Sequence, residues 1–214
     1  MTATPSPTSG WSDPDQVVWY LERIGKLEVS RSGEQMLAEL LPAAPTRVLD
    51  LGCGDGRLTA RVLAARPSVT TCLAVDRSEP MLAAARTRFA EQPIVDVRPW
   101  DLADPITSLG SFDVIVSGLA IHHLSDDRKR NLFAEIAAML SPGGLFANLE
   151  VVKSATPAHH AAFLAAIGRT EDDPQDRLVT VETQLTWMRE AGMVEVDCLW
   201  RWRGFALLVG ERPR

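Results

Sequence analysis

Three glycines at alternate positions follow a short apolar run, and this feature constrains the fold of the chain most. The stretch reads R-V-L-D-L-G-C-G-D-G-R-L from Arg47 to Leu58. A buried parallel strand that breaks into a tight loop and then a crossover helix has this pattern. Glycines remove side chains where a backbone must turn sharply or lie against a ligand. The helix expected over residues 57–66 would point its N-terminal amides at that ligand.

The spacing of the glycines separates two classes of ligand. Dinucleotide-binding proteins carry G-x-G-x-x-G, whose third glycine lets helix and strand pack closely around a pyrophosphate. This chain has G-x-G-x-G, and Arg57 stands where the third glycine would be. Asp50 stands at the end of the strand, where a carboxylate would repel a pyrophosphate but would suit a ligand that carries an ammonium group.

The segment V-L-D-L-G-C-G-D-G resembles motif I of the class I S-adenosylmethionine-dependent methyltransferases, a hydrophobic run followed by D-x-G-x-G-x-G. Every position of that signature is filled. The resemblance implies an α/β, Rossmann-like fold with a seven-stranded and mostly parallel sheet, an antiparallel C-terminal hairpin, helices on both faces and an N-terminal helical cap. It covers about residues 47–212 and implies S-adenosylmethionine as the cofactor.

Two acidic residues near the tips of later strands extend the resemblance. The strand expected over residues 70–76 ends in Asp76, 22 positions after Gly54, which fits a carboxylate that accepts hydrogen bonds from both ribose hydroxyls. NAD also contains a ribose, so this role does not separate the two cofactors. A third strand is expected to end at residues 100–102. In the family, an acid in the place of Asp101 binds the adenine amino group, and the amide of the next residue meets a ring nitrogen.

The methionine end of the cofactor is expected at Asp50 and the glycine-loop amides, and the transferred methyl near the end of the fourth strand. The cofactor-binding residues that the resemblance implies are Asp50, Gly52, Cys53, Gly54, Asp76, Arg77, Met81, Asp101, Leu102, Ser117 and Gly118.

The segment from Ser111 to Leu124 resembles motif IV, which faces the transferred methyl group. It lacks the N/D-P-P-Y/F tetrad of base-amine and glutamine methyltransferases, and no cysteine in the chain follows a proline as cytosine C5 enzymes require. Leu119 stands near the place of a metal-binding Glu in catechol-type enzymes, so no metal is expected. His122 and His123 are the candidate catalytic residues, because imidazole can take a proton from a hydroxyl or amine near neutral pH. The alternative is that they cap the next helix or fill space.

The segment that precedes the glycine loop is expected to form a flexible tail over residues 1–12 and cap helices over residues 13–42. Residues 43–214 are then a single methyltransferase domain. In proteins that resemble this one, such helices often lie across the cofactor pocket. Trp19 and Tyr20 are therefore candidate substrate contacts together with the histidine pair, although they would equally serve to attach the helix to the domain.

The second half of the chain is expected to complete the sheet. Its elements are a helix over residues 126–140, a sharp L-S-P-G-G turn, a strand over 145–152, a last helix ending at Gly192, and strands over 194–200 and 204–210. The antiparallel hairpin distinguishes class I methyltransferases from dehydrogenases. The charged run R-T-E-D-D-P-Q-D-R is expected to be a solvated loop, and His159 and His160 to lie exposed on a short helix.

Composition narrows the function further. The 214 residues carry a net charge of −6, which disfavours nucleic acid as a partner, although arginines gather near the C-terminus. No apolar run approaches the ~20 residues that cross a bilayer. The first residues are not expected to form a signal peptide, and three scattered cysteines are typical of a reducing cytoplasm. A cytoplasmic protein that is either a monomer or a homodimer is expected.

The sequence thus predicts an S-adenosylmethionine-dependent methyltransferase that acts on an oxygen or nitrogen atom of a small, partly apolar molecule. The reaction is an in-line displacement with S-adenosylhomocysteine as product. Two alternatives remain open. One is an enzyme that binds S-adenosylmethionine without methylating, similar to carboxy-S-adenosylmethionine synthase. The other is an NAD-dependent oxidoreductase.

Overall fold

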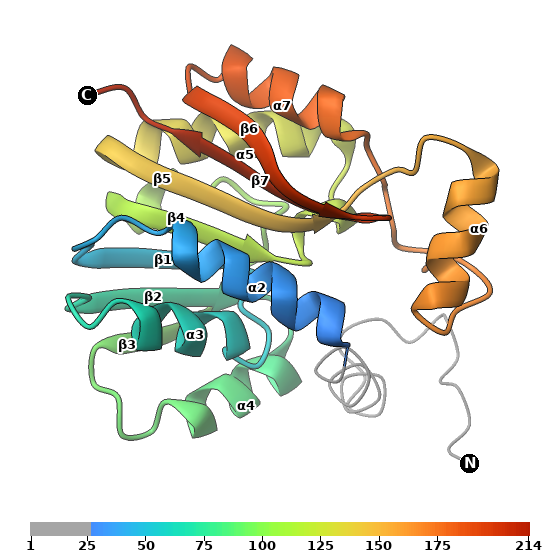
Figure 1. Ribbon diagram of the computed structural model, residues 1–214. Helices are drawn as coiled ribbons and strands as arrows, with labels where there is room; N and C mark the ends of the chain where they lie inside the picture. The colour runs from blue at the N-terminus through green and yellow to red at the C-terminus, as the bar shows by residue number, and fades with distance from the viewer. Residues whose placement is uncertain (1–26) are drawn as a thin grey trace.

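The computed structural model describes residues 27–214, which build one mixed sheet between two layers of helices (Figure 1). The strands are β1 (Arg47–Leu51), β2 (Thr71–Asp76), β3 (Val95–Pro99), β4 (Phe112–Gly118), β5 (Leu140–Val151), β6 (Val194–Trp202) and β7 (Phe205–Glu211). The helices are α2 (Glu28–Leu40), α3 (Arg57–Ala65), α4 (Glu79–Arg88), α5 (Asp126–Met139), α6 (Pro157–Ala166) and α7 (Val181–Glu190), with 3-10 turns η2 (Thr107–Leu109) and η3 (Ile121–His123).

The strand order is β3-β2-β1-β4-β5-β7-β6. Strands β1 to β5 pair in parallel, whereas β7 runs antiparallel between β5 and β6. This topology confirms the predicted fold class, including the antiparallel hairpin. The chain moves outward from β1 to β3 and then returns to place β4 on the other side of β1. Ligands of open α/β sheets bind at the carboxyl ends of the strands where the order reverses.

Each face of the sheet is covered by its own helices (Figure 1). Helices α5 and α7 pack on one face, where residues such as Phe133 and Met188 meet Leu49 and Phe146 of the sheet. Helices α2 and α3 pack on the other face against strand residues such as Val48, and α4 adds a smaller cluster beside them. Residues that alternate along one strand therefore enter opposite cores, as the pleat of a strand requires.

Several element boundaries differ from the prediction. Strand β5 begins at Leu140 instead of residue 145, because the expected L-S-P-G-G turn is absorbed into the strand by bonds between the backbones of Gly143, Gly144 and Arg212. Strand β3 ends at Pro99, which leaves residues 100–102 in the following loop. Helix α2 occupies residues 28–40, within the region of residues 13–42 where cap helices were expected.

The predicted tail and first cap helix lie outside the described residues, and so do Trp19 and Tyr20. From residue 27 onward, no helix combines the length and the hydropathy that crossing a membrane requires. The three cysteines are free thiols, and two of them, Cys53 and Cys72, are buried.

Phe133→Ala should lower the free energy of unfolding by roughly 3–5 kcal/mol, because the ring is fully buried against Phe146 and its loss leaves a cavity. Urea denaturation of purified protein measures the change. Leu199→Ala is the control, since Leu199 is 46% exposed and its loss should cost less than ~0.5 kcal/mol. Equal effects of the two substitutions would contradict this description of the core.

Candidate active site

A cavity of ≈ 190 Å³ opens at the carboxyl ends of the central strands, where the strand order reverses. The loops after β1, β2, β3 and β4 line it, together with residues from α2 and β5. Ten of the predicted cofactor residues are among its lining: Asp50, Gly52, Cys53, Gly54, Asp76, Arg77, Met81, Asp101, Leu102 and Gly118. Ser117 is not, because it is fully buried and its hydroxyl donates to the carbonyl of Leu51 at 2.8 Å.

The three loop glycines have different tasks. A Cβ on Gly52 would lie 2.2 Å from the Cβ of Ala120, and one on Gly56 would lie 2.4 Å from the ring of Phe89, so both permit close packing within the protein. Gly54 has φ of +54° and only the sulfur of Met81 nearby, at 3.8 Å. Gly54 therefore leaves the loop bare on its cavity side, where a ligand can approach the backbone.

The amides of this loop are used within the protein. Those of Gly52 and Cys53 donate to the carbonyl of Val75 at 2.8 and 2.9 Å, and that of Gly54 donates to the Asp76 carboxylate at 2.9 Å. The expectation that these amides hold the methionine end of a ligand therefore does not match this geometry. They fasten the loop to the end of β2 instead.

Asp76 is held by backbone donors on both carboxylate oxygens. One oxygen accepts the amide of Gly54 and the other accepts the amide of Ser78 at 2.8 Å. A carboxylate oxygen has two lone pairs, so each retains acceptor capacity toward the cavity. Burial raises the pKa of this carboxyl although the backbone bonds oppose the rise. The carboxylate is thus fixed in place while it can still accept hydrogen bonds from a ligand.

Asp50 is fully buried at the end of β1, on the face covered by α3. The Thr59 hydroxyl donates to one carboxylate oxygen at 2.5 Å, and the other oxygen has no hydrogen-bond partner among the described residues. Burial is the main cause that raises the pKa of Asp50 to about 7. A buried carboxylate with an unsatisfied oxygen is costly unless a donor or a cation meets it.

Asp101 follows β3 and closes a turn of its own loop. One of its oxygens accepts the amide of Ala103 at 2.9 Å, and the other lies 3.9 Å from the guanidinium of Arg77. A long ion pair therefore connects this loop with the residue that follows β2. Trp100, which precedes this acid, also lines the cavity.

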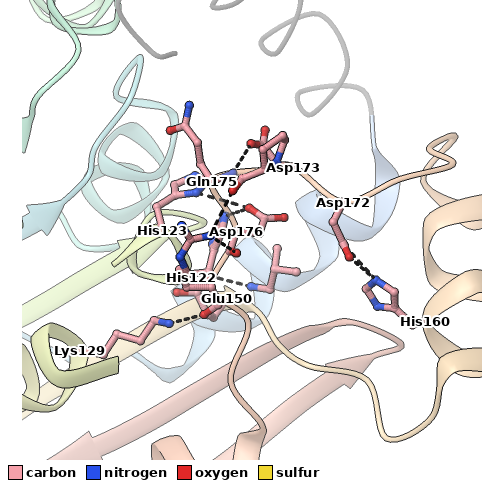
Figure 2. Close-up of polar contacts among 12 residues, drawn as sticks. His122, His123, Lys129, Glu150, His160, Asp172, Asp173, Gln175 and Asp176 are labelled. Atoms are coloured by element: carbon pink, nitrogen blue, oxygen red, sulfur yellow. Dashed lines mark hydrogen bonds and ion pairs between the residues drawn. The ribbon is translucent and has the colours of Figure 1, made fainter. Parts of the chain in front are cut away.

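The rings of the two histidines of η3 lie next to each other, with centroids 4.0 Å apart, but the two side chains have different surroundings (Figure 2). His123 lines the cavity, whereas His122 does not and is buried behind it. The Nδ1 atom of His122 lies 2.5 Å from the carboxylate of Glu150 on β5. Burial lowers the pKa of His123 to about 2. Burial acts to lower the pKa of His122 as well. The negative charges of Glu150 and Asp176 have the larger combined effect and raise that pKa above its usual value.

Asp176 reaches this pair from the connection between α6 and α7. Its Oδ1 atom lies 3.5 Å from His122 Nε2 and 3.4 Å from His123 Nδ1 (Figure 2). The amide of Arg177 donates to the carbonyl of His122 at 2.9 Å, and Lys129 donates to the Arg177 carbonyl. The expectation of a solvated loop is wrong for Asp176, whose side chain is only 10% exposed.

Sequence reasoning also missed two charged residues of the cavity wall. Glu34 of α2 is buried and pairs with Arg57 at 2.5 Å and with Arg61 at 3.3 Å. The helical pattern of α2 gave no reason to expect a buried acid. Arg57, in contrast, could have been found, because it occupies the place of a third glycine.

The comparisons with known proteins agree with this geometry. A methyltransferase-domain family model matches residues 48–144. A trans-aconitate 2-methyltransferase of Methylobacterium nodulans is 30% identical over 201 residues, which cover 86% of this chain and 71% of that protein. The human N-acetylserotonin methyltransferase, solved in complex with S-adenosylmethionine, matches 100% of this chain and 61% of its own with a TM-score of 0.70 and 14% identity.

The chain belongs to the class I S-adenosylmethionine-dependent methyltransferases. Another relative, an uncharacterised methyltransferase of Mycobacterium tuberculosis, is 38% identical over 128 residues. That match covers 58% of this chain and 59% of the relative, so the chain spans about three fifths of that relative's length.

The residues of the cavity fit the cofactor of this family. The unsatisfied oxygen of Asp50 can accept from an ammonium group, and Asp76 keeps acceptor capacity for hydroxyls. Gly54 lines the same cavity and offers no side chain of its own, with the Met81 sulfur 3.8 Å from where a Cβ would be, so an adenosyl ligand can approach the loop backbone there.

Asp76→Ala should lower the affinity for S-adenosylhomocysteine by ~1–3 kcal/mol, because ribose hydroxyls would lose their acceptor. Isothermal titration measures the change. Asp96→Ala is a matched control, since Asp96 is an exposed acid on neighbouring β3 that pairs with Arg98 outside the cavity. Unchanged affinity in Asp76→Ala would contradict the ribose assignment.

Proposed function

We propose that this chain transfers the methyl group of S-adenosylmethionine to an oxygen or nitrogen atom of a small molecule and releases S-adenosylhomocysteine. The observation that carries the proposal is that one cavity joins the acid that ends β2, the acid that follows β3, the Gly54 loop and the turn after β4. These points come from four strands and meet only because the strands are parallel and adjacent.

The proposed roles follow the order of the strands. Asp101 and Leu102 bind the adenine, with Arg77 and Met81 beside it. Asp76 binds the ribose, and Asp50 binds the ammonium group of the methionine end. In support, each of these residues lines the same cavity.

The methyl group is proposed to lie beside Gly118 and the turn that follows it. Gly118, Leu119 and Ala120 line the cavity there, and Leu119 holds φ of +57°, a conformation that is costly for a branched residue. The amide of Leu119 donates to the carbonyl of Leu149 at 2.8 Å, which fixes the turn against β5.

When bound, S-adenosylmethionine supplies an activated methyl group on a sulfonium. The lone pair of the acceptor would form the new bond to the methyl carbon as the carbon–sulfur bond breaks, and the histidine pair would receive the acceptor's proton. Holding both reactants in line lowers the activation barrier by roughly 7–11 kcal/mol. The protein's main task is therefore positioning, which the rigid strand-end turns can perform.

The acceptor end of the cavity is proposed to be the side of His123, Ala120 and Leu124, which continues past the turn after β4. The histidine pair is proposed as the place where the acceptor loses its proton. His123 lines the cavity and stays neutral because burial lowers its pKa, whereas the raised pKa of His122 beside Glu150 and Asp176 favours the proton there. An acceptor with a hydroxyl or amine group carries a proton that can be removed in this way.

The proposal is tested by identifying the cofactor. Isothermal titration of the full chain with S-adenosylhomocysteine and with NADH should show binding of the first and not the second, and mass analysis of molecules released from the purified protein should find no carboxylated cofactor. Methyl transfer is then followed as S-adenosylhomocysteine production with a panel of phenols, amines and carboxylic acids. The panel includes trans-aconitate because a relative bears that name. Tight binding of NADH alone would overturn the proposal.

Cofactor binding should release a proton near pH 6. The pKa of Asp50 is raised to about 7, so the free protein holds this carboxyl protonated below that pH, whereas an ammonium partner favours the ionised form. Affinity for S-adenosylhomocysteine should therefore rise from pH 6 to pH 8. Titration in buffers of different ionisation enthalpy measures the proton. Asp50→Asn should abolish the release, and a wild-type protein without it would contradict the ammonium assignment.

A further inference from the structure

We propose that His122, His123 and Asp176 form a binding site for one divalent transition-metal ion, represented by Zn²⁺. The three side chains offer two imidazole nitrogens and one carboxylate oxygen that all lie within 4.8 Å of one another. They come from two distant segments, the η3 turn after β4 and the connection between α6 and α7. The site runs against the expectation from sequence that the chain holds no metal.

The distances are those of ligands around an ion rather than of hydrogen-bonded partners. Asp176 Oδ1 lies 3.5 Å from His122 Nε2 and 3.4 Å from His123 Nδ1. Good hydrogen bonds of this kind span about 2.7–3.2 Å. Two ligands in tetrahedral positions, each about 2.0–2.2 Å from zinc, lie roughly 3.3–3.6 Å apart. The spacing therefore matches two edges of a zinc coordination polyhedron.

A second histidine–carboxylate pair in the same protein provides the contrast. His160 Nε2 lies 2.9 Å from both carboxylate oxygens of Asp172, which is ordinary ion-pair geometry (Figure 2). That pair is more exposed and has no third ligand atom in the described chain to form a metal cluster. The longer spacing at Asp176 is thus not how this chain generally arranges a histidine beside an acid.

Glu150 orients the first ligand. Its carboxylate is buried on β5 and lies against Nδ1 of His122, so the other ring nitrogen, Nε2, points to Asp176. The amide of Val151 donates to the same Glu150 oxygen at 2.8 Å and fixes it further. Histidines that bind metals commonly pair their other nitrogen with a carboxylate in this way.

Three protein ligands leave a coordination position open, as in catalytic rather than structural zinc sites. His123 lines the cavity, so an ion held by this cluster borders the acceptor end. This part of the inference rests on the proposed function. An oxygen of the acceptor would bind the ion, and its hydroxyl would lose a proton to water more readily. The imidazoles would then act as ligands instead of bases, and the acceptor class narrows to molecules with an oxygen donor.

The test is direct Zn²⁺ binding by the untagged full chain, measured in competition with a chromophoric chelator. We expect one Zn²⁺ per chain, and an affinity at least 100-fold weaker in His123→Ala and in Asp176→Asn. Glu150→Gln, which alters a positioning residue, should weaken binding about 10- to 100-fold. It should also shift the visible spectrum of the Co²⁺-substituted protein. His160→Gln is the matched control and should bind as the wild type does.

Absence of stoichiometric Zn²⁺ binding by the wild type would overturn the inference and leave the cluster as an ion-pair network that holds Asp176. Equal weakening in His160→Gln would overturn it too, because binding would then be nonspecific. Retained S-adenosylhomocysteine binding shows that each variant is folded. Titration with S-adenosylhomocysteine also separates the two proposals. If the wild type binds S-adenosylhomocysteine but no Zn²⁺, only the metal-site proposal fails.

Discussion

The candidate site depends on three hydrogen bonds, each donated by a backbone amide, that tie the loop after β1 to the end of β2. Two amides share the carbonyl of Val75, and the amide of Gly54 meets the carboxylate of Asp76. These bonds within the protein hold the loop against the end of β2. The Gly54 bond also fixes the Asp76 carboxylate, so the loop and this acid are positioned together in the cavity wall. Without these bonds the glycines would give only flexibility.

The rest of the site follows from the reversal of strand order beside β1. Parallel strands end at the same edge of the sheet, so the turns after β1 to β4 converge although they are far apart in sequence. Buried charge then accumulates at this edge. Asp50 and Glu34 are buried there on one side, while Glu150 lies under the histidine turn on the other. Such groups are costly to bury and are typical of functional sites.

The fold and the cofactor side could be predicted from the sequence because they depend on local patterns. The glycine loop and the acid at the tip of β2 are encoded by spacing within adjacent units, and ten expected residues line the cavity. Ser117 was expected to bind the cofactor but does not line the cavity. The pleat of β4 turns its side chain toward the neighbouring strand β1, where its hydroxyl donates to the carbonyl of Leu51. The partnership of His122, Glu150 and Asp176 also escaped prediction, because it joins three segments whose contact depends on the tertiary fold. Asp176 looked like one of several acids in a polar run.

The central claim is that the glycine loop and the strand-end acids bind one adenosyl ligand. A crystal structure of the full chain with S-adenosylhomocysteine tests it most directly. We expect adenine beside Asp101, ribose hydroxyls on Asp76, and the sulfur facing the turn at Ala120 and His123. A ligand bound elsewhere, or a cavity closed by side chains between Asp76 and Ala120, would contradict it.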